Sequence, residues 1–380
     1  MKILFLLHSL AHFGGVERVI TDKMNYLAQQ GHSVFLITYE QGNHSVVYTL
    51  NNSIKYVDLN CRYHTIYKYS LFIRLYKAFT MKKVFKHKLE SEVRSFSPDL
   101  IVFPTNVSDF LSVIMSSFPK IPKIIESHGA FNNTIMKPSV KGKIRGVFML
   151  RHIKKCSLLL SLTEGDASCW RRYVSNVKSL PNPVTFYFEK ENNIPKMKGR
   201  IISVGRIDEG KRYDRLIKAF SIIAPKYKEW FIDIFGKEDD PQVRASLVSQ
   251  IECLGLVDRI MFRAPTSKII DEYLSSEMFV LSSDSEGMPL VLLEAMSCGL
   301  PVVSVNCPYG PSDLIEDGVT GLLTQMNEVD LAEKMDWMIS HPDERRMMGE
   351  KAHIAAARYK PERVMKEWEE AYLSVINTTI

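Results

Sequence analysis

Short apolar runs that alternate with helix-like segments constrain the fold of this chain more than any other feature of its sequence. The first run, residues 2–8, is almost continuously apolar, as is typical of a parallel strand buried on both faces. Comparable runs recur along the chain, at residues 33–38, 55–57, 100–103, 123–126, 157–162, 200–204, 229–235, 259–263, 278–281 and 301–305. Because helical stretches fall between them, the pattern predicts doubly wound parallel sheets of the α/β class.

A proline-containing segment near the middle of the chain predicts a boundary between two domains. In Ser179-Leu-Pro-Asn-Pro-Val184 two prolines flank Asn182 and favour an extended turn, and about fifteen mostly polar residues follow. A new series of strands and helices begins at Arg200. At 380 residues the chain is long enough for two cores. We therefore predict domains at residues 1–182 and 183–361, followed by a terminal helix within residues 362–380.

The stretch after the apolar run 278–281 has the features of a phosphate site. A polar loop follows this run, and a helix is expected to begin at about Pro289, where a missing N–H costs nothing. The first amides of a helix are free and carry partial positive charge, and Gly287 lets a ligand approach the backbone. Amides from Gly287 to Val291 would therefore bind phosphate.

Two glutamates belong to the same stretch. Glu294 lies in an otherwise apolar helical segment, so its carboxylate is expected to be buried and to need a partner. That partner is either a ligand hydroxyl or a core arginine. Glu286 either binds the same ligand or is simply an exposed loop residue.

The charge of the chain is unevenly distributed. The formal net charge is +6, but residues 1–182 contain 25 Lys and Arg against 11 Asp and Glu. This excess of cations indicates a partner with an anionic surface, either a membrane or a nucleic acid. No apolar run approaches the length of a membrane span, and residues 1–7 are too short for a secretory signal, so we expect a cytoplasmic protein. The six scattered cysteines, without Cys-x-x-Cys, indicate reduced thiols.

Basic residues are interleaved with aromatic residues in the first half of the chain. Between Cys61 and Arg94 there are only two acids, Glu90 and Glu92. A second stretch, residues 127–163, has none. Such surfaces suit an anionic lipid headgroup layer, although a solvated basic face with inward aromatics gives the same pattern. Nucleic acid is not favoured, because no recognition module is present. The cations are Arg62, Lys68, Arg74, Lys77, Lys82, Lys83, Lys86, Lys88, Arg94, and then Lys137, Lys141, Lys143, Arg145, Arg151, Lys154 and Lys155.

The spacing of Glu286 and Glu294 gives a family resemblance. Seven residues separate them; Glu-Gly-Met-Pro begins at the first, and Ala-Met-x-x-Gly-x-Pro-Val-Val follows the second. This signature resembles that of family 4 of the retaining glycosyltransferases. The resemblance implies the GT-B fold, two Rossmann-like doubly wound domains facing a central cleft. It also implies that the first domain binds the acceptor, that the second binds a nucleotide sugar, and that the last helix crosses back to the first domain.

The resemblance also assigns roles to individual residues. In the second domain, Arg206 and Lys211 would neutralise the departing diphosphate, Glu286 would hold hydroxyls of the donor sugar, and Glu294 would hold the ribose. Amides of the segment Gly287, Met288, Pro289, Leu290 and Val291, the proline excepted, would hold phosphate. No metal is expected, because these groups take its place; Asp239, Asp240 and Asp284 are therefore not metal ligands.

The first domain supplies three further candidates. Gly14 and Gly15 follow the first strand without a Gly-x-Gly-x-x-Gly pattern, so the residues alone predict a tight turn. By resemblance they close over the donor. His128, in Ser127-His-Gly129, would be structural if taken alone, whereas the resemblance has it face the donor sugar.

The reaction implied is transfer of a hexose or N-acetylhexosamine, expected to be UDP-linked, to a saccharide hydroxyl with retention at the anomeric carbon. The acceptor is expected to be lipid-linked, in lipopolysaccharide or capsule synthesis at the inner membrane face, with the protein bound there peripherally. Two other functions fit the sequence. A GT-B-fold nucleotide-sugar 2-epimerase would turn over donor without acceptor. A non-catalytic nucleotide-sugar sensor would have no use for Arg206 and Lys211 as leaving-group cations.

Overall fold

The computed structural model of the protein describes residues 1–11, 14–136, 139–188 and 194–378. These residues form two compact units, Met1–Pro181 with Val364–Ile380, and Asn182–Arg363. Residues 182, 362 and 363, expected in the first domain, belong to the second unit. Asn182 is tied there because its backbone N–H donates to the Met288 sulfur at 3.2 Å. Lys137, loop residues 12–13 and linker residues 189–193 of the sequence analysis lie outside the described residues.

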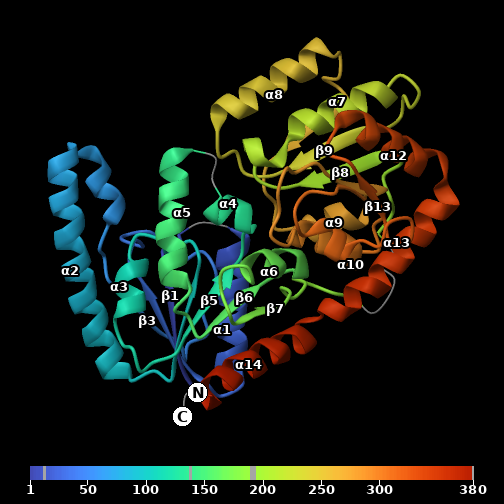
Figure 1. The fold of residues 1–380 in the computed structure, drawn as a ribbon. Coiled ribbons are helices and arrows are strands. Elements are labelled where there is room, and N and C mark those ends of the chain that lie inside the picture. The colour runs from blue at the N-terminus through green and yellow to red at the C-terminus, as the bar shows by residue number, and fades with distance from the viewer. Residues whose placement is uncertain (12–13, 137–138, 189–193, 379–380) are drawn as a thin grey trace. The chain divides into compact units, whose positions relative to one another are not determined.

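The first unit is built on a parallel sheet in the order β3-β2-β1-β4-β5-β6-β7 (Figure 1). The strands are β1 (Lys2–Leu7), β2 (Ser33–Thr38), β3 (Lys55–Asp58), β4 (Leu100–Pro104), β5 (Lys123–Ser127), β6 (Leu158–Ser161) and β7 (Val177–Ser179). The helices are α1 (Gly15–Gln29), η1 (Tyr63–Lys68), α2 (Leu71–Phe96), α3 (Leu111–Ser116), α4 (Phe131–Ile135), α5 (Val140–Ile153), α6 (Glu164–Trp170) and α14 (Pro361–Asn377), the last from Val364 onward.

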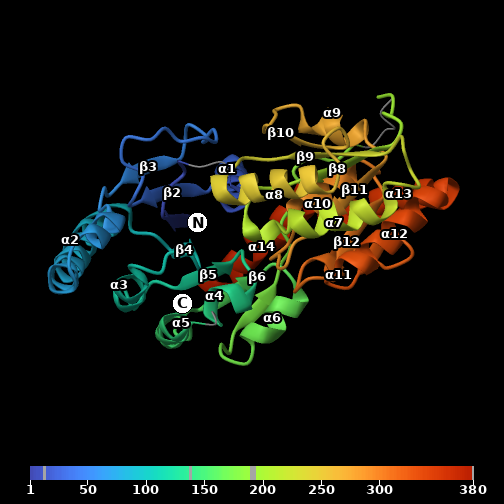
Figure 2. The same cartoon turned by 90° about the horizontal axis from the view of Figure 1, so that it is seen from above.

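Helices cover both faces of this sheet, which explains why its strands are apolar on both sides. Leu4 and Leu6 of β1 join a core with α2, α3, α4, α5 and α6. Phe5 points to the other face, where its ring meets Tyr372 of α14 at a centroid distance of 6.4 Å. In both views α3 lies between α2 and α5 (Figures 1 and 2).

The second unit repeats this plan with the strand order β10-β9-β8-β11-β12-β13. Its strands are β8 (Arg200–Val204), β9 (Phe231–Phe235), β10 (Ile260–Arg263), β11 (Met278–Leu281), β12 (Val302–Val305) and β13 (Leu322–Thr324). Its helices are η2 (Glu209–Lys211), α7 (Tyr213–Ile223), α8 (Pro241–Cys253), α9 (Ile269–Leu274), α10 (Leu290–Ser297), α11 (Pro311–Leu314), α12 (Glu328–Ser340), α13 (Pro342–Ala356) and η3 (Ala357–Tyr359).

Alternation along β11 separates the two faces of the second sheet. Met278 and Val280 join the core formed with α7, α8 and α12. Phe279 points to the opposite face, where its ring packs against Tyr273 of α9 at 6.1 Å. Both sheets are parallel throughout the described strands, so the predicted fold class of two doubly wound α/β domains is confirmed.

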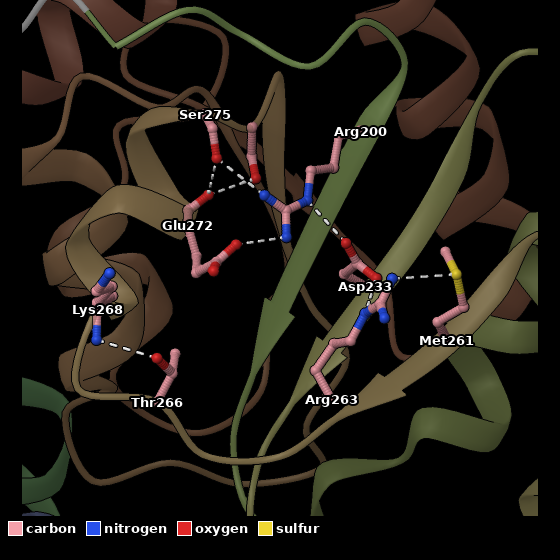
Figure 3. A network of polar contacts seen from close by, with 9 residues as sticks. Arg200, Asp233, Met261, Arg263, Thr266, Lys268, Glu272 and Ser275 are labelled. Atoms are coloured by element: carbon pink, nitrogen blue, oxygen red, sulfur yellow. Dashed lines mark hydrogen bonds and ion pairs between the residues drawn. The ribbon is translucent and has the colours of Figure 1, made fainter.

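An ion network connects three neighbouring strands of the second sheet and α9 (Figure 3). Arg200, the first residue of β8, pairs with Asp233 of β9 at 2.8 Å and with Glu272 of α9 at 2.6 Å. Asp233 also accepts from Arg263 of β10 at 2.7 Å. Arg200 is the first residue of β8, Asp233 the middle residue of β9 and Arg263 the last residue of β10, so the network runs obliquely across these three strands.

Sequence and structure differ mainly at short or interrupted elements. The edge strands β7 and β13 are three residues each and carry too few positions for a visible pattern. After β8 the chain forms η2 and then α7 as separate elements, because Arg212 adopts a left-handed conformation with φ +51° between them. The expected helix start at Pro289 is displaced by one residue, with Pro289 as the N-cap of α10.

Candidate active site

The strand order of the second unit predicts where a ligand binds. The order reverses between β8 and β11, which are neighbours although β9 and β10 lie between them in sequence. In doubly wound sheets, ligands bind beyond the carboxyl ends of the strands at such a reversal. The loops that follow β8 and β11 are residues 205–212 and 282–289, the same segments that contain the candidate residues of this unit.

The two loops are joined by an ion pair between candidate residues. Lys211 Nζ lies 2.6 Å from Glu286 Oε1, and both side chains are largely buried. The backbone is tied as well, since Ser282 Oγ donates to the Lys211 carbonyl and the Asp284 amide to the Gly210 carbonyl. The structure therefore brings Lys211 and Glu286 together.

A second set of ion pairs fixes the loop after β8. Arg212 Nη1 lies 2.8 Å and Arg215 Nη2 lies 2.6 Å from the two carboxylate oxygens of Asp284. Hydrogen bonding to Asp214 and Asp284 raises the pKa of Arg212 above its ordinary value. The Asp284 carboxylate is thus already neutralised by two guanidinium groups.

The N-terminus of α10 presents backbone donors. The amides of Leu292 and Leu293 donate to the Pro289 carbonyl. Within the described residues, the earlier amides of Gly287, Met288, Leu290 and Val291 have no protein acceptor. Unsatisfied donors at a helix start favour an anion, which is the role predicted for this segment.

A close approach of Gly310 supports the loop before α10. A Cβ at Gly310 would lie 2.4 Å from Pro289 Cδ and 3.0 Å from the Gly287 carbonyl oxygen. Glu286 and Tyr309 are also paired through the backbone: the Glu286 amide donates to the Pro308 carbonyl, and the Tyr309 amide to the Glu286 carbonyl. Only glycine at position 310 lets these two chain segments approach so closely.

Glu294 is buried in α10, as the sequence predicts. Its side chain accepts a hydrogen bond from Tyr273 Oη of α9 at 3.1 Å, and the residue is 7% exposed. Burial, followed by the negative charge of Glu294, raises the pKa of Tyr273 well above 10. The tyrosine is therefore neutral, and its hydroxyl donates one of the hydrogen bonds that the buried carboxylate of Glu294 accepts.

Arg206 is the most exposed of the candidate cations. Its side chain is 60% exposed and pairs with Asp239 at 3.0 Å and with Asp208 at 3.3 Å. Asp240, the other acid excluded as a metal ligand, caps α8 by accepting from the amides of Gln242 and Val243. In the described part of the chain no group of three or more His, Cys, Asp or Glu residues has the arrangement of a metal site.

The first unit places its candidates on two elements. Gly14 is the N-cap of α1 and Gly15 its first residue. His128 directly follows β5; its side chain is 4% exposed and hydrogen-bonds through Nε2 to Glu126 at 2.8 Å. It lines a pocket of about 330 Å³ together with Thr105, Asn106, Asn133, Thr134 and Arg145, among others.

Comparison with known proteins decides the family. A sequence profile described as "Glycosyltransferase Family 4" matches residues 13–185, and one described as "Glycosyl transferases group 1" matches residues 186–354. The chain belongs to glycosyltransferase family 4. An uncharacterized glycosyltransferase of Haemophilus influenzae is 26% identical over 97% of this chain and 99% of its own length.

This glycosyltransferase is also similar to one further protein in sequence and to a solved structure in fold. GalNAc-alpha-(1->4)-GalNAc-alpha-(1->3)-diNAcBac-PP-undecaprenol alpha-1,4-N-acetyl-D-galactosaminyltransferase of Campylobacter jejuni is 27% identical over 99% of each chain. A crystal structure of a point mutant of S. aureus TarM, in complex with fondaparinux, alpha-GlcNAc-glycerol and UDP, has a TM-score of 0.77 and 17% identity. The alignment covers 99% of this chain and 100% of that one. The latter similarity shows the fold.

The basic segment of the glycosyltransferase carries aromatic side chains on its outside. On α2, Phe72, Tyr76 and Phe79 are more than half exposed, whereas Phe85 is fully buried. On α5, Val140, Ile144 and Val147 are also more than half exposed. The interpretation of a solvated face with inward aromatics is therefore wrong for the first half of α2. No helix in the described residues combines the length and the hydrophobicity needed to span a membrane.

Sequence reasoning missed several residues that organise the glycosyltransferase site. Tyr273 carries no motif and contacts Glu294 only through the tertiary fold. The Asp284 partners Arg212 and Arg215 stand close to Lys211 in sequence, so their positive charge was a usable signal. Lys23 of α1 and Glu126 of β5 form a buried ion pair at 2.6 Å, and of the two only Glu126 was detectable, as a charged residue at the end of an apolar run.

Proposed function

We propose that the protein transfers a hexose or N-acetylhexosamine from a UDP-sugar to a saccharide hydroxyl with retention of the anomeric configuration. The bond between the anomeric carbon and the phosphate oxygen breaks, and a bond from the acceptor oxygen forms on the same face. The acceptor proton passes to an oxygen of the departing diphosphate. The products are UDP and the elongated saccharide.

The observation that carries this proposal is the set of groups gathered at the strand-order reversal of the second unit. Lys211 is paired with Glu286, and free amides stand at the start of α10 and in the two loop residues that follow Glu286. A leaving diphosphate gains negative charge in the transition state, so a fixed cation and oriented amides stabilise it most at that moment. Arg206 would add a second cation, from a side chain exposed enough to reorient.

Glu294 would hold the nucleoside. A carboxylate can accept several hydrogen bonds, and the neutral Tyr273 hydroxyl supplies one of them to this buried group. The short helix α10 contains Glu294 as well as Leu290 and Val291, so one rigid element would bind both the ribose and the phosphate. Glu286 would bind hydroxyls of the transferred sugar, and Gly14, Gly15 and His128 keep their predicted roles toward the donor.

The chemistry is proposed to need no metal ion. The acids nearest the candidate cations already have partners: Asp284 has Arg212 and Arg215, and Asp239 has Arg206. Lys211 and the α10 amides supply the positive charge that a divalent cation supplies to diphosphates elsewhere.

The substrates are proposed from the relatives. The TarM complex contains UDP, and the name of the Campylobacter jejuni enzyme specifies an undecaprenol-diphosphate-linked saccharide acceptor. We propose the same classes of donor and acceptor here, in the synthesis of a bacterial surface polysaccharide at the cytoplasmic face of the membrane.

A thermal-shift panel tests the donor class directly. A ligand that binds only the folded state raises the melting temperature, and the increase grows with the logarithm of the ligand concentration divided by its Kd. UDP and at least one UDP-sugar are expected to raise it, whereas ADP and GDP at equal concentration are not. Incubation of the stabilising UDP-sugar alone, then with lipid-diphosphate-linked oligosaccharides, separates transfer from epimerisation, and NMR of the product assigns the anomer. Absence of any shift with uridine nucleotides would contradict the proposal.

The membrane surface is proposed to be contacted by the outer faces of α2 and α5. Leu71, Phe72, Tyr76 and Phe79 provide exposed apolar area at the start of α2. Lys77, Lys82, Lys83 and Lys86 follow on the same helix. Rings enter the headgroup boundary and cations meet anionic headgroups, a combination that binds an acidic bilayer without crossing it.

Liposome flotation tests this surface. The full chain is expected to float with vesicles of phosphatidylcholine and phosphatidylglycerol at low salt, and less at high salt because the Debye length shortens. The double variant Phe72→Ser/Tyr76→Ser is expected to lose binding. The matched control Val257→Ser/Ile354→Ser removes exposed apolar residues of the second unit and should float normally. Equal loss in both variants, or no flotation of the wild type, would argue against this surface.

A further inference from the structure

Glu126 of β5 is the centre of a buried polar cluster in the first unit. Its Oε2 atom lies 2.6 Å from Lys23 Nζ of α1 and 2.8 Å from His128 Nε2. Its Oε1 atom accepts from Tyr372 Oη of α14. Side chains of Lys23 and Glu126 are each 1% exposed. Three donors from three parts of the chain therefore converge on one carboxylate.

The carboxylate of Glu126 is ionised. Burial alone would raise its pKa, but the charge of Lys23 and the hydrogen bonds from His128 and Lys23 lower the pKa of Glu126 to about 2. Burial lowers the pKa of Lys23, and the charge of Glu126 opposes this effect. The ammonium also stands 3.4 Å from the centre of the Trp368 ring, which favours its charged form.

This ionised carboxylate fixes the tautomer of His128. An ionised carboxylate only accepts hydrogen bonds, so Nε2 of His128 must carry the proton. Burial is the largest influence on the ring and lowers the pKa of His128 below 6.5, which favours the neutral ring at pH 7. Its second nitrogen, Nδ1, is therefore an acceptor with a lone pair. Within the described ranges this buried atom has no hydrogen-bond partner.

The surroundings of His128 match a hydroxyl ligand. The pocket that it lines is bordered by the neutral polar side chains of Thr105, Asn106, Asn133 and Thr134. These amides and hydroxyls both donate and accept, as sugar hydroxyls do. A buried acceptor without a partner is costly, and a hydroxyl donor removes that cost.

We propose that Glu126 and Lys23 are positioning residues that hold His128 neutral with Nδ1 as the acceptor of a saccharide hydroxyl. The inference rests on the proposed function and goes beyond it by naming the groups that set the protonation of His128. A protonated or oppositely tautomeric ring would present N–H to the ligand in place of a lone pair. Buried ion pairs often add little net stability to a fold. Positioning His128 gives the pair of Lys23 and Glu126 a role other than stabilisation.

A solely structural role makes different predictions. Tyr372 and Trp368 connect the same cluster to α14, and Trp368 Nε1 donates to the Pro181 carbonyl at 2.8 Å. If the cluster only anchors α14, every substitution in it should lower the free energy of unfolding. The tautomer of the His128 ring should then not depend on Glu126. Tyr372→Phe is the matched control, since it removes the donor to Oε1 and leaves both contacts of Oε2 intact.

The experiment is nitrogen-15 NMR of the histidine rings in the full chain. His128 is assigned by the signal lost in His128→Gln. The wild type should show a neutral ring with a proton on Nε2 at pH 7, as should Tyr372→Phe. Glu126→Gln, which removes the ionised acceptor, should shift the tautomer populations of His128. A cationic ring, or a proton on Nδ1, in the wild type would overturn the proposal without any reference to activity.

Binding measurements then identify the source of the hydroxyl. UDP, UDP-N-acetylglucosamine and UDP-glucose are titrated into the wild type, Glu126→Gln and Tyr372→Phe, and so are free methyl glycosides of both sugars. A hydroxyl of the donor predicts that Glu126→Gln weakens UDP-sugar binding about tenfold while UDP binding is unchanged, the loss of roughly one hydrogen bond. A hydroxyl of the acceptor predicts weakened glycoside binding only. If Glu126→Gln weakens the binding of neither the UDP-sugars nor the glycosides, the inference is overturned. Failure of UDP to bind the wild type contradicts the proposed function instead.

Discussion

Lys211 and Glu286 stand 75 positions apart in the chain, yet their Nζ and Oε1 atoms lie 2.6 Å apart. Lys211 lies in the loop after β8, and Glu286 lies in the loop after β11. The parallel pairing of these strands brings the two loops to the same edge of the sheet. The pair therefore marks the point where the strand order reverses and where a nucleotide diphosphate would be bound.

Removal of the Lys211 charge should abolish most turnover. Lys211→Ala or Lys211→Met is expected to lower kcat about 10²–10³-fold, the effect of deleting one group that stabilises charge in a transition state. Circular dichroism should show an unchanged fold. Lys218→Met, on the exposed side of α7, is the matched control and should keep wild-type kcat. Near-normal turnover of the Lys211 variants would remove this residue from the mechanism.

Glu294 should distinguish ribose from deoxyribose. Glu294→Ala is expected to reduce turnover by orders of magnitude. Glu294→Gln keeps an oxygen for Tyr273 but loses the charge, and UDP binding should weaken about tenfold or more, the value of a hydrogen bond to a charged group. Calorimetry of UDP and 2′-deoxy-UDP checks the assignment. The wild type should prefer UDP and the Gln variant should not; equal wild-type affinities would mean that Glu294 does not read the 2′-hydroxyl.

Chelation should leave the reaction intact. Because Lys211 and the α10 amides are proposed to neutralise the diphosphate, EDTA is expected to change kcat by less than about twofold, which is a barrier change below roughly 0.4 kcal/mol. The measurement is initial rate with and without EDTA, followed by added Mg²⁺ or Mn²⁺. A large loss that Mg²⁺ restores would show that a divalent cation takes part.

Stability should decrease as the pH drops through the region where His128 titrates. Burial lowers the pKa of His128 below 6.5 in the folded state, so the unfolded chain binds a proton first as the pH drops. The stabilising contribution is complete above about pH 6.5 and is lost below it, by up to about 1.4 kcal/mol per pH unit. The pKa of Glu126 is likewise lowered, from 4.5 to about 2, so its contribution to stability is also lost as the pH falls through this range.

Urea unfolding at a series of pH values measures this dependence. His128→Gln keeps a donor toward Glu126 but cannot titrate, so its free energy of unfolding should fall less steeply below pH 6.5. His152→Gln, at a partly exposed position of α5, is the control and should follow the wild type. Identical slopes for the wild type and His128→Gln would contradict a neutral buried ring.

The ion network of the second sheet should matter for stability and not for catalysis. Arg200→Met leaves the buried Asp233 carboxylate without its more deeply buried partner and is expected to destabilise the protein by roughly 3–5 kcal/mol. Arg263→Met removes a half-exposed partner of the same carboxylate and should cost about 1 kcal/mol or less. Urea unfolding measures both. Turnover per folded molecule should be unchanged in either variant.

The relation between sequence and structure is clearest at particular elements. Strands β2, β8 and β11 match the predicted apolar runs residue for residue, because interior parallel strands bury both faces and are therefore mainly apolar. Burial of Glu294 followed from the apolar helix around it. The left-handed conformation of Arg212, between η2 and α7, could not be predicted from the sequence pattern, since non-glycine residues rarely adopt it.

Local sequence by itself determined the strand and helix series, the break near Asn182, the helix start near Pro289 and the two glutamates of the family signature. These properties depend on neighbours in the chain: hydrophobic periodicity, proline geometry and residue spacing. Only the tertiary structure decided the strand order, the pairing of Lys211 with Glu286, the Tyr273 contact to Glu294 and the convergence of Lys23, His128 and Tyr372 on Glu126. Except for His128 and Glu126, which are two positions apart, those contacts join residues distant in sequence. Their geometry arises only when both sheets have formed and their helices have packed.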